Sequence, residues 1–414
     1  MQHDCHTKAH PPGRKNVTDI RSAETNIVDE NDKGKSPQRS RLTHKVLGLA
    51  KRILFSNLKF KTYHNCKFSR FDYFRLLTYA GTHRCYAEGS SNNLKFGSDA
   101  ACPTADALFH HLKKFSEEEL SRSYQQATDD IILLAKNRGL LNGPLTVAID
   151  LTDERYYGDK NDPMVVGAEY KLGTTKVYRF ATLTVTEKHC RLVIRAIPVA
   201  EGFKKHEVVA DLLAYAKERI EIGVVCMDRG FHSTEVYSTF DSMGIKYLTP
   251  AVMTSRTLWA IRARQPPKII PFVIKNRDCS KNVQTNLVIV LDDDMERMCY
   301  FTNMELDRMH TRHLNKLYEK RWGIETAFRE MKKFRAKTTS KNYVIRWFYF
   351  LFSMCLYNLW EYTNMLLSVI VKQNIPDMTT LLFGTLLYQG FELGGVDPPP
   401  KEKIGKYHAR DVKG

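Results

Sequence analysis

The stretch LTVAIDLT, residues 145–152, is a short apolar run that ends in acidic and polar residues, and it decides the fold class. A run of this length and composition is typical of a buried β-strand. Farther along, the segments 176–187 (KVYRFATLTVTE) and 190–199 (CRLVIRAIPV) alternate and are rich in β-branched residues. Lys188 and His189 separate them, which indicates a tight hairpin. Together the three segments predict a meander of strands.

Helical and strand patterns then alternate along the chain. Residues 206–219 (HEVVADLLAYAKER) have helical periodicity, and 224–228 (VVCMD) is a second short apolar run that ends in an acid. Ser233 is a suitable N-cap for a helix to about Met243, and residues 245–251 (IKYLTPA) favour another strand. A meander followed by alternating units predicts an α/β fold with a mixed sheet and flanking helices.

The remaining segments predict the domain organisation. Thr104 and the pair Ser116 and Glu119 are helix-capping signals within a helical stretch that ends at Gly139 or Gly143. Long helices are expected at 306–335 and 343–371. The expected regions are a disordered arm (1–45), a helical and possibly DNA-binding region (46–140), a catalytic sheet domain (141–251 and 306–372), a β-rich insertion (252–305), and a C-terminal segment with a loose tail (373–414).

Composition narrows the class of partner. A net charge of +17 indicates a polyanion, either nucleic acid or an acidic membrane. The apolar run at 347–360 is shorter than the ~20 residues that span a bilayer, so a buried helix is expected and no membrane. The N-terminus lacks an apolar secretory segment, and the nine cysteines form no CxxC pair, which predicts reduced thiols in a cytoplasm. No Walker A or GxGxxG motif indicates a nucleotide cofactor.

The residues that carry chemistry are two aspartates and one helix face. Asp150 and Asp228 end the two apolar runs, where ligands gather in an α/β sheet. In YEKRWGIETAFREMKK (318–333), a helix places Tyr318, Arg321, Glu325 and Lys332 within an arc of roughly 60°. A carboxylate can hold a divalent metal, and the cations and phenol can bind phosphates. A solvated face with Arg–Glu pairs at i,i+4 is the alternative.

Three carboxylates can hold two Mg²⁺ or Mn²⁺ ions, which suits phosphodiester chemistry. Asp153 and Glu154 lie close to Asp150 and are alternative ligands, although the strand pattern favours Asp150. Arg329 lies on the face of Glu325, where it can meet DNA or pair with that acid. The basic residues at 332, 333, 335, 337 and 341 suit either a phosphate track or simple solvation.

Three blocks in order give a family resemblance. They are Asp150 in AIDLTDERYYG, Asp228 in D-x-G-F, and the full Y-x2-R-x3-E-x6-K at 318–332. In these blocks the chain resembles DDE transposases of prokaryotic insertion sequences, the group with the YREK signature, over about 140–371. The resemblance implies an RNase H-like domain, with Asp150 on the first strand, Asp228 on the fourth, and Glu325 on a helix after the β-rich insertion.

The resemblance also implies an activity and its partners. The three acids would hold the metals, while Tyr318, Arg321 and Lys332 would bind DNA phosphates near the cleaved end. The enzyme would hydrolyse phosphodiesters at the terminal inverted repeats of its element and transfer the strands into target DNA. It would act on double-stranded DNA as a homodimer or higher oligomer on paired ends, at the nucleoid in the cytoplasm. The alternatives are a catalytically silent DNA-binding protein derived from a transposase, and a membrane-associated protein built on residues 343–371.

Overall fold

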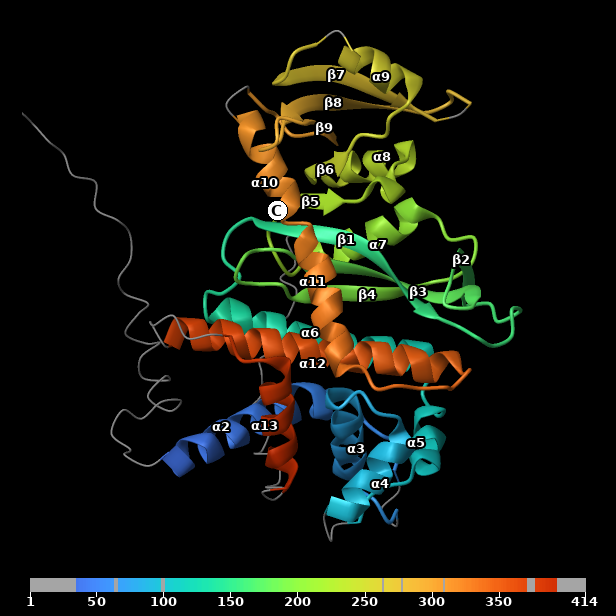
Figure 1. Ribbon diagram of the computed structural model, residues 1–414, viewed down its shortest axis with the longest axis vertical. Coiled ribbons are helices and arrows are strands. Elements are labelled where there is room, and N and C mark those ends of the chain that lie inside the picture. Colours follow the sequence, from blue (N-terminus) through green and yellow to red (C-terminus); the bar gives the residue numbers. More distant parts are fainter. Residues whose placement is uncertain are drawn as a thin grey trace, which may run out of the picture.

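The computed structural model describes residues 35–62, 66–97, 101–262, 264–276, 278–307, 310–370 and 377–392. Within them, one mixed sheet runs through the upper part of the molecule in the view of Figure 1. Its order is β2-β3-β1-β5-β6-β9-β8-β7, and β4 pairs with β3. The strands are β1 (Leu145–Arg155), β2 (Val165–Lys171), β3 (Thr174–Val185), β4 (Val193–Val199), β5 (Ile222–Met227), β6 (Tyr247–Pro250), β7 (Lys268–Lys275), β8 (Asn282–Leu291) and β9 (Arg297–Thr302).

Most helices lie below or across this sheet in Figure 1. The helices are α2 (Lys35–Ala50), η2 (Lys51–Phe55), α3 (Arg70–Thr82), α4 (Ala87–Gly97), α5 (Ala105–Leu112), α6 (Glu117–Asn137), α7 (Lys205–Lys217), η3 (Arg229–Phe231), α8 (Thr234–Met243), α9 (Ser255–Arg262), η4 (His310–His313), α10 (Leu314–Glu319), α11 (Trp322–Met331), η5 (Lys332–Phe334), α12 (Tyr343–Ile370) and α13 (Thr380–Glu392). Of these, α8, α9 and α10 flank the upper strands of the sheet.

The expected α/β class with a mixed sheet is confirmed. Strands β1, β3 and β4 form the meander, and β5 and β6 continue it in parallel with β1. The expected first and fourth strands are therefore β1 and β5. One strand was not expected: β2, VVGAEYK, pairs with the first half of β3 as an outlying hairpin. Its side chains are mostly exposed after Val166, so its sequence lacks the apolar pattern of a core strand.

Two boundaries differ from those expected. Strand β1 does not end beside Asp150 but runs on to Arg155 along β3. The segment expected as a separate β-rich insertion extends the same sheet, because β9 pairs with β6. The insertion strands β7, β8 and β9 thus continue the sheet at the top of Figure 1. The open edge of β6 pairs with β9 through backbone hydrogen bonds, because an unpaired edge strand presents free N–H and C=O groups.

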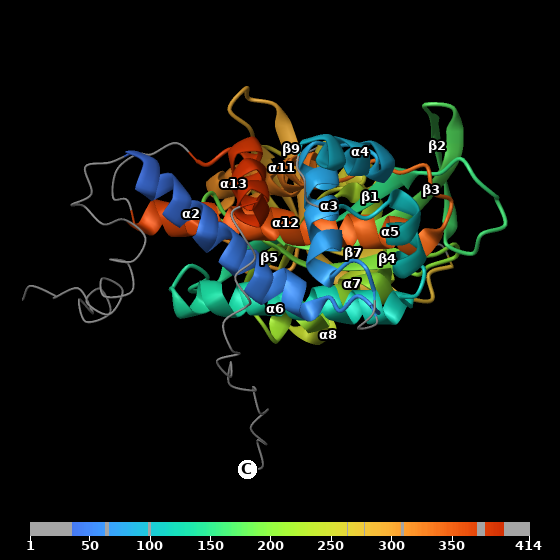
Figure 2. The same cartoon turned by 90° about the horizontal axis from the view of Figure 1, so that it is seen from below.

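The aromatic helix α12 is buried between the sheet and the helical region. The ring centroid of Phe180 on β3 lies 4.9 Å from that of Trp347 and 4.3 Å from that of Phe350. Helices α6 and α11 pack on opposite sides of α12 (Figure 2). The expected apolar helix is therefore a core helix. In the chain segments that the structure describes, no helix combines the length and apolar character needed to cross a membrane.

The helical region before the sheet begins earlier than residue 46. The expected arm of residues 1–45 is helical from Lys35 onward, while residues 1–34 and the expected loose tail from residue 393 lie outside the described residues. The capping signals act as the sequence predicts. Thr104 accepts a hydrogen bond from the amide of Ala107, and Ser116 forms a capping box with Glu119. Helix α13, from the C-terminal segment, packs against α2 and α3. All cysteines among the described residues are free thiols.

Candidate active site

Asp150 and Asp228 lie at the same level on neighbouring parallel strands. The last register pair of β1 and β5 is Ile149 with Met227, and the aspartates follow this pair, Asp150 within β1 and Asp228 directly after the end of β5. Parallel neighbours are ~4.8 Å apart, so the register brings the two acids together. Asp228 then leaves the sheet as the N-cap of η3, where its carboxylate accepts a hydrogen bond of 2.6 Å from the amide of Arg229.

Glu325 reaches the same place from α11, which packs across β1 and β3. The close approach of the helix depends on Gly323. A Cβ at this glycine would lie only 3.0 Å from Cβ of Thr186, at the end of β3. Glu325 stands in the first turn of the helix, where the exposed backbone amides favour negative charge.

Arg321 connects two of the acids. Its Nη2 donates a hydrogen bond of 2.9 Å to Oε1 of Glu325, and its Nη1 lies 4.0 Å from Oδ2 of Asp150. The side chain is buried, and its Nε has no hydrogen-bond partner within the described residues. One guanidinium group therefore spans the space between the carboxylates of Asp150 and Glu325.

The surroundings of Asp150 change the pKa of its carboxyl group. Burial, and to a smaller extent the negative charges of Asp228 and Glu325, raise its pKa to about 6. The amide of Leu151 and the Arg321 guanidinium oppose that rise. The charges of Asp228 and Glu325 thus both act on the carboxyl of Asp150.

Tyr318 stands at the back of the same site. It belongs to α10 rather than to α11, because the expected continuous helix is interrupted by a turn at residues 320–321. Its hydroxyl donates to the carbonyl of Met227, at 3.4 Å, directly before Asp228. Burial raises the pKa of Tyr318 to about 12, although the Arg321 guanidinium lowers it. The phenol therefore keeps its proton at neutral pH.

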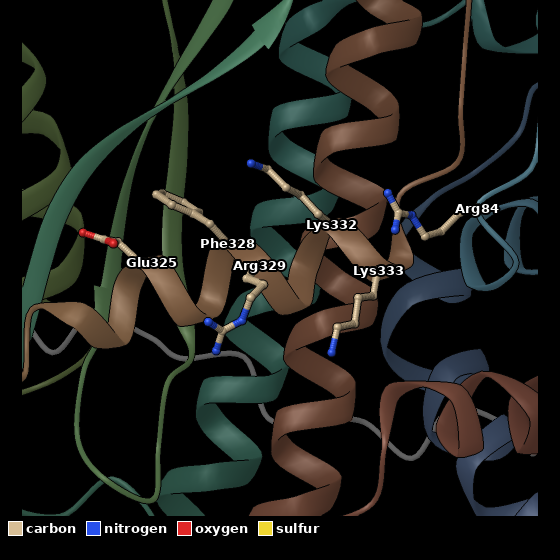
Figure 3. A pocket seen from close by; sticks show the side chains of 6 residues that line it. All are labelled: Arg84, Glu325, Phe328, Arg329, Lys332 and Lys333. Carbon is tan, nitrogen blue, oxygen red and sulfur yellow. The ribbon is translucent and has the colours of Figure 1, made fainter.

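Lys332 lies at the other end of α11, away from the acids. A pocket of about 450 Å³ runs along the helix from Glu325 to Lys332 (Figure 3). Crowding by the protein lowers the pKa of Lys332, and the nearby cations Arg335 and Lys171 lower it further. The pocket is lined by Arg84, Glu325, Phe328, Arg329, Lys332 and Lys333.

The alternative acids on β1 are engaged elsewhere. Asp153 forms a two-pronged ion pair with Arg179 on β3. Glu154 is half-buried between Arg335 and Arg346, at 3.4 and 3.3 Å. Among the described residues, the ion pairs of these two acids lead away from Asp228 and Glu325, whereas Asp150 is linked to Asp228 by the strand register and to Glu325 through Arg321.

A family model described as "Transposase DDE domain" matches residues 143–359, which is more than half of the chain. The chain belongs to the transposase DDE domain family. The matched range contains β1, β5 and α11, the three elements that supply the acids. The DNA transposase function expected from the sequence is confirmed at the level of the family, whose members cleave DNA and transfer its strands.

Solved structures agree with this assignment in fold. The transposase resembles the piggyBac transposase synaptic complex with hairpin DNA with a TM-score of 0.50 and 9% identity, over 84% of this chain and 79% of that chain. At this identity the likeness concerns the fold alone. The Mos1 transposase paired-end complex with left transposon end gives a TM-score of 0.18 with 13% identity, over 39% of this chain and 58% of that one. A TM-score this low is too weak to indicate a shared fold. No curated protein sequence matches significantly.

Two expectations for basic residues of the transposase need correction. Arg329 does not pair with Glu325; its Nε lies 3.6 Å from Glu330. Arg335 is not part of a solvent-facing phosphate track, because it is buried against Glu154. No motif in the sequence marks Arg84, which lies far from α11 in the chain and reaches the pocket only through tertiary packing.

Proposed function

We propose that this transposase cleaves phosphodiester bonds at the ends of its element and joins the freed 3′ ends to target DNA. Asp150, Asp228 and Glu325 would hold two divalent ions, Mg²⁺ or Mn²⁺. The observation that supports the proposal is that the strand register sets Asp228 beside Asp150, while one guanidinium, that of Arg321, lies between Asp150 and Glu325. Bound there, the ions would activate the attacking oxygen and stabilise the leaving oxygen.

The donor set fits such ions in its chemistry. Carboxylate oxygens are the ligands that Mg²⁺ prefers. In the described part of the chain, no three His, Cys, Asp or Glu side chains lie close enough together to hold a metal ion. The Arg321 guanidinium lies between Asp150 and Glu325 instead. Use of Glu325 as a ligand therefore requires that its ion pair with Arg321 opens.

Tyr318, Arg321 and Lys332 would bind the phosphates of the DNA. The protonated Tyr318 hydroxyl can donate a hydrogen bond to a phosphate oxygen. An Arg321 released from Glu325 keeps its charge and presents a planar pair of N–H groups, which suits a phosphate. Lys332 lies one helix length away, so the DNA backbone would follow α11 from the acids to the pocket.

The partner would be double-stranded DNA, both the terminal inverted repeats of an insertion sequence and the target. The net charge of +17 supports a polyanionic partner. We also propose that two or more copies assemble on paired ends. Mass photometry with and without a duplex carrying an element end would show a dimer or larger assembly on DNA.

Cleavage assays test the three acids one by one. Asp150→Ala, Asp228→Ala and Glu325→Ala should each abolish Mg²⁺-dependent cleavage of a duplex with the sequences that flank the gene. Binding of that duplex should persist. Asp153→Ala is the matched control, because it removes the next acid along β1, which lies on the opposite face of the strand and pairs with Arg179 outside the site, and it should keep cleavage.

A second measurement separates metal binding from activity. Mn²⁺ should raise the melting temperature of the wild type and of Asp153→Ala, and should do so much less in the three active-site variants. Cleavage that survives in one of these variants would remove that acid from the site. A wild-type protein that binds the duplex but never cleaves it would instead indicate a silent DNA-binding protein.

A further inference from the structure

We propose that Arg84, in the connection between α3 and α4, is a DNA phosphate-binding residue that completes a groove with Lys332 and Lys333. The groove would guide the DNA backbone toward Glu325, and this direction rests on the proposed function. Through Arg84, the N-terminal helical region would contribute to the DNA-binding surface beside the proposed active site.

The first support is the composition of the pocket. Four cations line it, and Glu325 at one end is the single acid among its lining residues. Figure 3 shows Arg84 beside the C-terminal end of α11, with its guanidinium pointing toward the end of the helix that carries Lys332 and Lys333, whose side chains extend in different directions. A cavity of about 450 Å³ with this lining is suited to an anion rather than to an apolar ligand.

The second support is the free charge of Arg84. Lys333 and Arg329 share Glu330, at 2.6 and 3.6 Å. The side chain of Arg84 is exposed and forms no ion pair or hydrogen bond with the part of the chain that the structure describes. Lys332 has cations rather than acids as its charged neighbours. A phosphate would therefore neutralise charges that the protein itself leaves uncompensated.

The third support is the backbone of Arg84. Helix α3 ends in a Schellman motif, in which the amide of Arg84 donates to Gly81 at 3.1 Å and that of Cys85 to Ala80 at 2.9 Å. The residue at the position of Arg84 adopts a left-handed conformation, here with φ +53°. Glycine is the usual residue there, because a Cβ crowds the following carbonyl oxygen in this conformation. An arginine at this position is unfavourable for the fold, which suggests a use for its side chain.

The fourth support is the firm attachment of this loop to the end of α11. The amide of Lys337 donates to the carbonyl of Cys85 at 3.0 Å, and Tyr86 and Lys337 form a β-bridge. Gly81 packs so closely that an added Cβ would lie 2.5 Å from the carbonyl oxygen of Phe334. Arg84 is thus held at a fixed place beside Lys332 and Lys333, as a preorganised binding site requires.

The test uses Arg84→Gly, because glycine favours the backbone conformation while it removes the charge. We expect its melting temperature to equal or exceed that of the wild type. Its affinity for a fluorescent duplex of mixed sequence should depend less on salt, with a slope of log K against log salt that is smaller by about 1. The advantage of the wild type should therefore shrink about 3-fold between ~50 and ~200 mM salt. Arg84→Lys should restore most of the slope.

Arg122→Ala is the matched control, since it also removes one exposed arginine. Arg122 is on α6, which lies on the other side of α12 from α11 (Figures 1 and 2). Its salt dependence should equal that of the wild type. If Arg84→Gly and Arg122→Ala bind alike, the groove is refuted. The two proposals fail separately, because Asp150→Ala should keep the full salt slope, and cleavage by that variant would count only against the metal site.

Discussion

Asp150 shows how one half-buried acid at the candidate site can be costly for folding. Its neighbours include two other acids, and only Arg321 and one backbone amide favour its charged form. A carboxyl in such a place binds its proton more tightly in the folded protein than in the unfolded chain. The ionised carboxylate of Asp150 therefore destabilises the folded protein, and a bound cation would relieve this destabilisation.

Replacement of Asp150 by asparagine should stabilise the metal-free protein. With a pKa of about 6 when folded and 3.8 as its ordinary value, the wild type loses stability as pH rises from ~4 to ~6. The loss approaches 3 kcal/mol at neutral pH. Urea unfolding in EDTA should therefore show Asp150→Asn more stable at pH 7 by up to about 3 kcal/mol. The gain should disappear near pH 4, and an equal gain at both pH values would contradict the electrostatic explanation.

At the scale of elements, β1 continues past the active site because its charged residues find partners. Asp153 pairs with Arg179 across to β3, and Glu154 is held by Arg335 and Arg346. The latter contact ties the strand to the segment after α11 and to α12. The side chains of Glu154 and Arg346 are only 14% and 8% exposed, so this ion-pair network is shielded from solvent.

Glu154→Gln should therefore destabilise the protein by roughly 3–5 kcal/mol, because it leaves two buried guanidinium groups without a counter-charge. Asp153→Asn, one residue earlier, should cost no more than about 1 kcal/mol, since its pair with Arg179 is partly exposed. Thermal or denaturant unfolding of the two variants compares these values directly. Similar losses in both would show that burial does not govern the strength of these pairs.

At the scale of the whole molecule, the helical region and the sheet domain behave as one packed body. Helix α12 contacts both, and the end of α3 fits against the segment after α11 at Gly81. This contact sets the position of the α3–α4 connection relative to the proposed active site. Any shift there should affect stability and DNA binding together.

Gly81→Ala should destabilise the protein by about 1–3 kcal/mol, because the new methyl group meets the backbone oxygen of Phe334. Gly89→Ala is the control within the same region. It adds a methyl group to α4 in open space and should stabilise the protein by roughly 0.5–1 kcal/mol. Calorimetry should thus show opposite signs for the same substitution. A loss of salt-dependent DNA binding in Gly81→Ala alone would link the packing to the groove.

Local pattern was enough for much of the fold and for the composition of the candidate site. The apolar runs before Asp150 and Asp228 predicted β1 and β5, and the capping residues predicted the ends of α5 and α6. Strand β2 escaped because its exposed residues carry no apolar alternation. The end of β1 was placed too early because the charges after Asp150 resemble a strand end until their arginine partners are known.

The sequence by itself determined the family, the order of the core strands β1, β3, β4, β5 and β6 with the helices between them, and six residues on which the proposed chemistry rests. These properties depend on short-range periodicity and spacing, which a single chain displays directly. Only the tertiary structure decided how the residues meet: that Arg321 lies between Asp150 and Glu325, that Arg335 is buried against Glu154, and that Arg84 faces Lys332 and Lys333. Such contacts join residues far apart in the chain, and packing of whole elements sets them rather than any local preference.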